Sequence, residues 1–275
     1  ENEVATFVAD VHFSSNKFAQ EPRWKQMRSR VVLSVRFGES VLGMLDLQSD
    51  QPKMHLRNEL IGLQLVAIIW TYAVAGTLDF AKGGILQGLI AGPSVAILLA
   101  LYAFGIGKAA LMPFHRWLPA AMVAPTPVSA LLHAVAVVKA GVFTMLKVGI
   151  YIFGIEFLAE SGASTWLMWL AAFSILAASV IAMTKDNLKA RLAYSTISQL
   201  GYMFLALGVG AWSSAIFHLM THAFFKALLF LTAGSIILGM HHEQNIFKMG
   251  GLRKDLPWSH ALFLIGTLGL VAFPG

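Results

Sequence analysis

Seven long apolar stretches dominate the chain after residue 60 and constrain what it can fold into. They cover residues 61–78, 84–106, 127–153, 164–184, 192–209, 212–240 and 259–275. About 20 residues of α-helix cross the hydrocarbon core of a bilayer, and each stretch is close to that length or above it. The sequence therefore predicts a mostly α, polytopic transmembrane helix bundle with about six or seven spans.

Composition supports a membrane protein. The 275 residues are 57% hydrophobic and only 12% charged, whereas about 25% of residues are charged in an average soluble domain. Residues 1–59 hold 8 of the 20 Lys and Arg and 8 of the 14 Asp and Glu, so the net charge of +6 belongs to the apolar part. We assign these basic residues to membrane-protein loops and expect no nucleic-acid partner. The absence of cysteine excludes disulfides and thiolate metal sites.

Residues 1–60 are expected to form a separate, small, partial α/β segment before the membrane domain at 61–275. Residues 31–37 and 41–48 are rich in β-forming side chains, and Gly38, Glu39 and Ser40 between them suit a hairpin turn. The run RSRVVLSVRFGESVLGMLDLQSDQP resembles the late hairpin of a GAF-type sensor domain. That resemblance includes no ligand residues, so it implies no sensing function. The acidic first ten residues predict no signal peptide.

Glycine and proline interrupt the apolar pattern between residues 105 and 127. The interrupting residues are Gly105, Gly107, Pro113, Pro125 and Pro127. Breaks at membrane depth are tolerated only where protein or a water-filled cavity covers the freed backbone groups. Discontinuous helices of this kind are common around ion sites in transporters, so we expect broken helices here.

Titratable cations lie inside these uncharged stretches without a carboxylate beside them. They are Lys108, His133, Lys139, Lys147, His218, His222 and Lys226. A charge at membrane depth is costly, so each such residue is a functional-site hypothesis by default. A row of bases without fixed acidic partners predicts groups that exchange protons, and hence movement of H⁺ through a membrane.

The spacing of His218, His222 and Lys226 is the most specific part of this pattern. Positions i, i+4 and i+8 place them on one helix face within about 12 Å of axial rise. Histidine titrates near neutral pH, so this stripe can pass protons by way of water. A zinc site is the rival interpretation, because two histidines at i and i+4 are good ligands. The neighbouring lysine would repel a metal, and no metal or other cofactor is expected.

The other cations admit two interpretations each. Lys108 stands between glycines in an apolar run, where it is either a proton-exchanging group or a lysine that extends from a helix end to the interface. His133 is either a relay or a buried hydrogen-bonding group. Lys139 lies six residues later, about 120° around an ideal helix, and too deep to reach the interface easily. Lys147 is expected to be an interfacial anchor.

Basic residues in the predicted loops give an orientation. Arg116, Lys185, Lys189, Arg191, Lys248, Arg253 and Lys254 fall in loops on one side of the predicted bundle, and only Lys82 falls in a loop on the other. Cytoplasmic loops carry the excess of Lys and Arg, so the first side is expected to be cytoplasmic. The helix after Arg191 carries Ser195, Thr196, Ser198 and Gln199. These side chains could hydrogen-bond to neighbouring helices, and helix packing is the interpretation that we favour.

Three segments carry a resemblance to a known family. They are GKAALMPFHRWLPAAMVAPTPVSALLHAVAVVKAG, DNLKARLAYSTISQLGYMFLALGV and HLMTHAFFKALLFLTAGS. They resemble the core of the proton-conducting antiporter family, which includes the antiporter-like subunits of respiratory complex I and Mrp-type Na⁺/H⁺ antiporter subunits. The resemblance covers about residues 69–275, and the form AVAVVKAG is more similar to the Mrp-type branch of the family.

The resemblance assigns proton-relay roles to six positions. Lys108 is similar to the central lysine of the family's broken helix, His133 and Lys139 match the next relay positions, and His218, His222 and Lys226 match its central connecting row. The family's earlier glutamate-bearing helix and its later broken helix have no counterpart here. Residues 61–275 are therefore expected to be an incomplete antiporter domain.

Three functions follow from these observations. The first is proton translocation within a multisubunit Na⁺ or K⁺/H⁺ antiporter. The second is a proton-pumping membrane subunit of an NADH:quinone oxidoreductase or a related membrane-bound hydrogenase, whose redox chemistry belongs to other subunits. The third is a non-functional truncated or chimeric fragment. The expected partners are the lipid bilayer and other membrane subunits, and the expected place is a bacterial inner membrane with the N-terminal segment in the cytoplasm.

Overall fold

The computed structural model describes residues 29–37, 40–49 and 55–273. The chain divides into two units, Glu1–Glu59 and Leu60–Gly275. In the first unit, β1 (Ser29–Phe37) pairs with β2 (Ser40–Ser49) as an antiparallel hairpin, with Leu33 opposite Leu45. The two predicted strands are therefore confirmed. The predicted turn residues Gly38 and Glu39 lie outside the described residues, and the likeness to a GAF domain stays a prediction.

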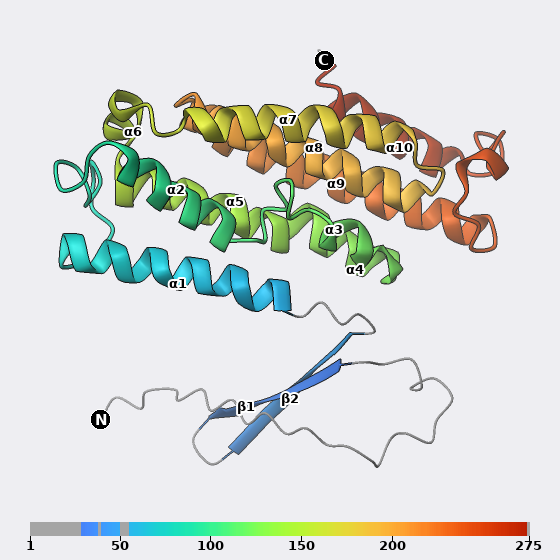
Figure 1. The fold of residues 1–275 in the computed structure, drawn as a ribbon. Helices are drawn as coiled ribbons and strands as arrows, with labels where there is room; N and C mark the ends of the chain where they lie inside the picture. The colour runs from blue at the N-terminus through green and yellow to red at the C-terminus, as the bar shows by residue number, and fades with distance from the viewer. Residues whose placement is uncertain (1–28, 38–39, 50–54, 274–275) are drawn as a thin grey trace. The chain divides into compact units, whose positions relative to one another are not determined.

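Helices make up the second unit (Figure 1). Their bounds are α1 His55–Ala75, α2 Pro93–Gly105, α3 Trp117–Ala120, α4 Thr126–Ala130, α5 Val137–Lys147, α6 Ile155–Ser161, α7 Thr165–Met183, α8 Leu188–Gly208, α9 Trp212–Gly239 and α10 Pro257–Leu270. Short 3₁₀ turns occur at η2 (Ala121–Val123) and η5 (Ile246–Lys248). From α7 onward the chain runs up and down, so that consecutive helices lie antiparallel and contact one another. The predicted helix bundle is confirmed.

The predicted apolar stretches do not all become spanning helices. By length and composition, Thr126–Phe153, Thr165–Met183 and Trp212–Gly239 are long and apolar enough to cross a membrane in the described part of the chain. The stretch at 84–106 gives only the 13-residue α2, because Gly84, Gly88 and Gly92 adopt positive φ angles before the helix begins at Pro93. α8 has 21 residues but carries polar side chains, and α10 has only 14 residues.

The predicted break between residues 105 and 127 is confirmed. α2 ends at Gly105, and Gly107 follows with φ of 51°, a left-handed conformation that glycine adopts at little cost. Helical structure resumes only in the short α3 and η2. Pro125 then caps α4, and Pro127 occupies its first turn, where the missing N–H of proline costs nothing.

A single rod of helix, residues 126–153, contains two π-helical segments, η3 (Leu131–Val135) and η4 (Val148–Phe153). In η3, the N–H of Ala136 donates to the carbonyl of Leu131 at 2.9 Å, which is the i to i+5 pattern. Such π segments inside α-helices occur frequently at functional sites. The first of them carries His133 and ends just before α5, which carries Lys139.

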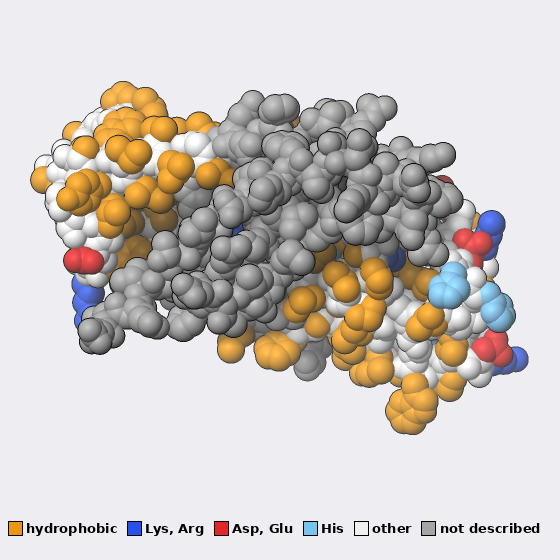
Figure 2. All heavy atoms as spheres, turned by 90° about the horizontal axis from the view of Figure 1, so that it is seen from below, with side chains coloured by type: hydrophobic (Ala, Val, Ile, Leu, Met, Phe, Trp, Pro, Cys, Tyr) orange, Lys and Arg blue, Asp and Glu red, His pale blue; other side chains and the backbone are white. Residues whose placement is uncertain are grey.

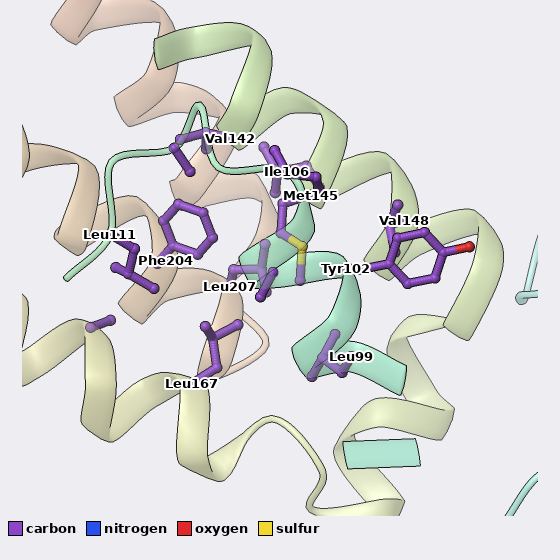
Figure 3. Packing of buried hydrophobic residues seen from close by; sticks show 14 of the residues in the cluster. Leu99, Tyr102, Ile106, Leu111, Val142, Met145, Val148, Leu167, Phe204 and Leu207 are labelled. Atoms are coloured by element: carbon purple, nitrogen blue, oxygen red, sulfur yellow. The ribbon is translucent and has the colours of Figure 1, made fainter. Parts of the chain in front are cut away.

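The hydrophobic core lies where α2, α5, α7 and α8 meet. Figure 3 shows Tyr102 of α2 and Ile106, the C-cap of α2, packed beside Met145 of α5. Leu167 of α7 and Phe204 of α8 lie close by. Outside this core, large apolar side chains remain exposed along whole helix faces. On α7 they are Trp169, Phe173, Leu176 and Val180, each more than half exposed. Apolar side chains also cover much of the visible face between the charged ends in Figure 2, as expected for a surface that faces lipid or other apolar protein.

Close packing at Gly141 generates a test of the fold. A Cβ at this position on α5 would lie 2.6 Å from the backbone N of Ala109 and 2.9 Å from the carbonyl carbon of Lys108. We expect Gly141→Ala to force the 106–116 segment away from α5 and to destabilise the protein by about 1–3 kcal/mol, since overpacking usually costs that much. Thermal unfolding in detergent measures the change.

Gly62→Ala is the matched control, because Gly62 of α1 has nothing within 4 Å of an added Cβ. This substitution should leave the melting temperature unchanged or raise it, since alanine favours helix over glycine. Equal behaviour of the two variants would contradict the close approach of residues 108 and 109 to α5.

Candidate proton-relay site

Buried and partly buried bases from the 126–153 rod and from α9 form the candidate site. α9 contacts α8, α5 and the η3 segment, so it brings side chains of all these elements together. His133, His222 and Lys226 are fully buried, and Lys139 is 7% exposed. We call the set of His133, Lys139, His218, His222 and Lys226 the basic row.

A hydrogen bond between Lys139 and His222 is the centre of the basic row. It joins Nζ of Lys139 on α5 to Nδ1 of His222 on α9. Such a bond needs one donor and one acceptor. Either a lysine amine or ammonium donates to Nδ1 of a neutral imidazole, or an imidazolium donates from Nδ1 to a neutral amine. The pair can therefore share one proton, with either member carrying the charge.

Lys226 is held one helical turn further along α9. Its Nζ donates to Oγ of Ser195 at 2.8 Å and to the carbonyl oxygen of Leu192 at 3.3 Å, both on α8. These neutral oxygens orient the amine without fixing a charge on it. A carboxylate in their place would fix a positive charge on the lysine. For Ser195 the sequence offers either a hydrogen bond to a neighbouring helix or simple packing, and in the structure it is a direct partner of Lys226 on α9.

Two further histidines flank this centre. The rings of His218 and His222 lie 5.8 Å apart, and His133 lies 4.9 Å from the ring of Phe230. Among the described residues, both ring nitrogens of His133 and Nε2 of His218 and His222 are buried without a protein hydrogen-bond partner. Buried polar groups of this kind ordinarily bond to internal water, which also carries protons between groups that do not touch.

No carboxylate is among the buried polar residues from 60 to 273. Two positive charges 6 Å apart, the rise between His222 and Lys226 on an ideal helix, repel by about 3 kcal/mol at an effective dielectric constant of 20. Desolvation adds to this cost. Charging every base of the basic row at once is therefore costly. Within the described residues, no group of three or more His, Asp or Glu is arranged to hold a metal ion.

Lys108 stands apart from the basic row. It lies in the turn after α2, and its side chain is exposed. Its backbone packs against Gly141, two residues after Lys139, so the segment that carries it touches the site. The structure therefore places Lys108 at the border of the site and does not bring its ammonium into contact with the buried bases.

Lys189 is a buried cation that the sequence analysis assigned to a loop. It is 3% exposed, and its Nζ donates to the carbonyl oxygen of Ala124 at 2.5 Å. A periodicity signal could have identified it. Lys189, Leu192, Ala193 and Thr196 recur at helical spacing on the buried face of α8, whereas loop counting treats every Lys outside an apolar stretch alike.

Comparisons with known proteins cover nearly all of the second unit. A family model described as NADH:quinone oxidoreductase/Mrp antiporter, TM, matches residues 61–275. The chain is 52% identical over 177 residues to NADH-quinone oxidoreductase subunit L of Escherichia coli, which covers 64% of this chain and 28% of that protein. It is 42% identical over 225 residues to NAD(P)H-quinone oxidoreductase chain 5 of Synechocystis, covering 76% of this chain and 32% of that protein.

Solved structures show the same fold. Respiratory complex I from Thermus thermophilus with bound aureothin contains a chain that matches with a TM-score of 0.64 and 28% identity, over 80% of this chain and 47% of that one. The Mrp complex from Dietzia gives a TM-score of 0.69 at 23% identity, over 80% of this chain and 41% of that one, and at this identity shows the fold alone.

The matches therefore cover most of this chain but only part of each relative. The chain spans about a third or less of the length of the curated relatives it matches. The family model begins at residue 61, so it gives no support to the resemblance of residues 1–60 to a GAF domain. Because that model matches 61–275 and the helices and basic row lie in the same range, the chain belongs to the NADH:quinone oxidoreductase/Mrp antiporter family of membrane proteins.

Proposed function

We propose that this chain carries protons through a bacterial inner membrane as part of a membrane subunit of an NADH:quinone oxidoreductase. From the sequence alone, the cation/H⁺ antiporter is the first hypothesis and the oxidoreductase is the second. The curated relatives reverse this order, because those at 52% and 42% identity are quinone oxidoreductase subunits. Other subunits would supply the redox chemistry.

The hydrogen bond between Lys139 and His222 is the observation that carries the proposal. A lysine that bonds to a neutral base can release its proton more readily than a lysine paired with a carboxylate, because the carboxylate stabilises the charged ammonium. The low dielectric of the interior makes a second proton on the pair costly. A proton that arrives at one end of the basic row therefore favours departure of another from the opposite end.

The remaining members extend this pair in two directions along α9. His218 lies one turn before His222, and Lys226 one turn after it, so the three span about 12 Å of helix. His133 lies beside Phe230, one turn beyond Lys226. The basic row runs along the axis of α9 for part of the bilayer thickness, which suits conduction of protons along the row. Lys108, at its border, would exchange protons with the row through water.

Exchange of Na⁺ or K⁺ for H⁺ is the alternative, and a direct measurement separates the two. In inverted membrane vesicles that contain the assembled complex, proton uptake driven by NADH supports the oxidoreductase proposal. Proton movement that instead requires a Na⁺ or K⁺ gradient and ignores NADH would establish the antiporter.

The basic loops predict the orientation of the chain. In the structure, the connections after α7 and after α9 lie at the same end of the second unit (Figure 1), where Asn187 pairs with Asn245. Because the chain lacks native cysteine, single cysteines at Lys254 and Glu160 report each end. Lys254→Cys should react with an impermeant thiol reagent only in inverted vesicles, and Glu160→Cys only in intact cells. The reverse labelling pattern would overturn the positive-inside assignment.

The shared-proton pair predicts energetic coupling between Lys139 and His222. We expect the destabilisation of the Lys139→Met and His222→Gln double variant to differ from the sum of the single effects by about 0.5–3 kcal/mol, as for residues in direct contact. Thermal unfolding in detergent measures it.

Lys147→Met with His222→Gln is the control pair. Lys147 belongs to the same helix, but its Nζ lies 4.3 Å from the ring of Phe80 and has no contact with the row. The effects of this pair should add. Additive effects for Lys139 and His222 as well would show that their hydrogen bond contributes nothing.

Arginine substitutions distinguish exchangeable protons from fixed charges. Lys139→Arg and Lys226→Arg should each lower NADH-driven proton transport by at least about tenfold, because arginine effectively never releases its proton. Lys254→Arg, at an exposed loop position, is the control and should transport normally. The readout is proton uptake per assembled complex, with NADH oxidation recorded in parallel. Full transport in both buried variants would refute a relay through these lysines.

A further inference from the structure

We infer that Lys189 is a positioning residue, whose buried ammonium holds the start of the 126–153 rod in register with α8 and so aligns the basic row. This inference rests on the proposed function. It concerns a residue outside the row, with a role different from that of the row's own lysines. The rod carries His133 and Lys139, and α8 carries the partners of Lys226, so their alignment sets the geometry of the whole site.

The contact lies where the rod begins. Nζ of Lys189 donates to the carbonyl oxygen of Ala124 at 2.5 Å, one residue before Pro125, the cap of α4. Oγ of Ser129 in the first turn also reaches this carbonyl, at 3.2 Å, and that of Pro125, at 3.2 Å. The Ala124 carbonyl thus joins α8 to the rod through two side chains.

Local chemistry explains why this junction needs a strong donor. Pro125 and Pro127 have no N–H, so the backbone around them offers fewer hydrogen-bond donors than an ordinary helix start. A charge-assisted hydrogen bond from an ammonium is shorter and stronger than one between neutral groups. Lys189 supplies such a bond and is almost completely buried while it does so.

The position of Lys189 within α8 argues that the contact is specific. Asn187 is the N-cap of α8, with its side-chain oxygen accepting from the N–H of Ala190 at 3.0 Å, so Lys189 falls in the first turn. A cation there opposes the helix dipole and would be better placed in solvent. Burial against the Ala124 carbonyl overcomes that preference.

α8 therefore fixes two parts of the site at once. Lys189 holds the start of the rod, and Leu192 and Ser195, three and six residues later, hold Lys226 of α9. A straight helix keeps these contact points at a fixed spacing, close to 1.5 Å of rise per residue. Loss of the Lys189 contact would let the rod shift while Lys226 stays, which would change the distances along which protons move.

Rescue by arginine distinguishes positioning from proton transfer. Lys189→Arg keeps a permanent cationic donor for the Ala124 carbonyl, whereas Lys189→Met keeps the length and removes the donor. We expect Lys189→Met to lower NADH-driven proton uptake per assembled complex by at least about tenfold, since a misplacement near 1 Å can cost a hundredfold. Lys189→Arg should retain at least half of the transport.

Lys254→Met is the matched control, since it removes one positive charge from an exposed loop position. Lys139→Arg and Lys226→Arg, measured in the same vesicles, test the proposed function separately. If those two variants fail and Lys189→Met equals the control, only the positioning role is wrong. If they transport normally, the relay itself is wrong.

A loss of transport in Lys189→Arg at normal abundance of the complex would show that Lys189 exchanges protons, which overturns the positioning role. If Lys189→Met does not assemble, the Arg variant alone decides. Transport retained in an assembled Lys189→Arg complex supports the inference, and transport lost at normal abundance contradicts it.

Discussion

The burial of lysine and histidine against one another, without a carboxylate in the described interior, is the interaction on which this structure depends. Lys139 and His222 come from helices that lie far apart in sequence, and their hydrogen bond links α5 to α9. A buried base that has no acidic partner must share protons or lose them, because an isolated charge in an apolar interior is costly. In the proposed function, the same feature that makes the bundle's interior expensive to charge would give it a means of moving protons.

α8 organises the surroundings of that pair. It supplies Ser195 and the Leu192 carbonyl to Lys226, and Lys189 to the carbonyl of Ala124. A further contact comes from Oγ of Ser198, 2.9 Å from Oγ of Ser179 on α7. The polar face of this helix is thus used for contacts between helices. Large apolar side chains stay exposed on the outside of the bundle, and the described parts of the face in Figure 2 show many of them, which fits the bilayer setting of the family.

The departures from a regular helix lie next to the site. The break after Gly105 brings the backbone of residues 108 and 109 against Gly141, and the π segment η3 carries His133. A regular α-helix satisfies its own backbone and presents side chains at fixed angles. The breaks and π segments change those angles, which lets His133 and Lys139 both lie buried although an ideal helix would separate them by about 120°.

The sequence by itself determined the helical class, the break near residues 105–127, the hairpin strands and the five bases of the basic row, because apolar length, glycine and proline, and i, i+4 spacing are local properties. Only the tertiary structure decided which bases meet. The pairing of Lys139 with His222 and of Lys226 with Ser195 joins residues 83 and 31 positions apart, and no periodicity reports such contacts. The tertiary structure also decided which of two lysines, Lys108 and Lys189, is buried. The first is a lysine in an apolar run that remains exposed, and the second is a loop-like lysine that is buried. Burial is set by the helices that pack around a residue, which is a property of the assembled bundle.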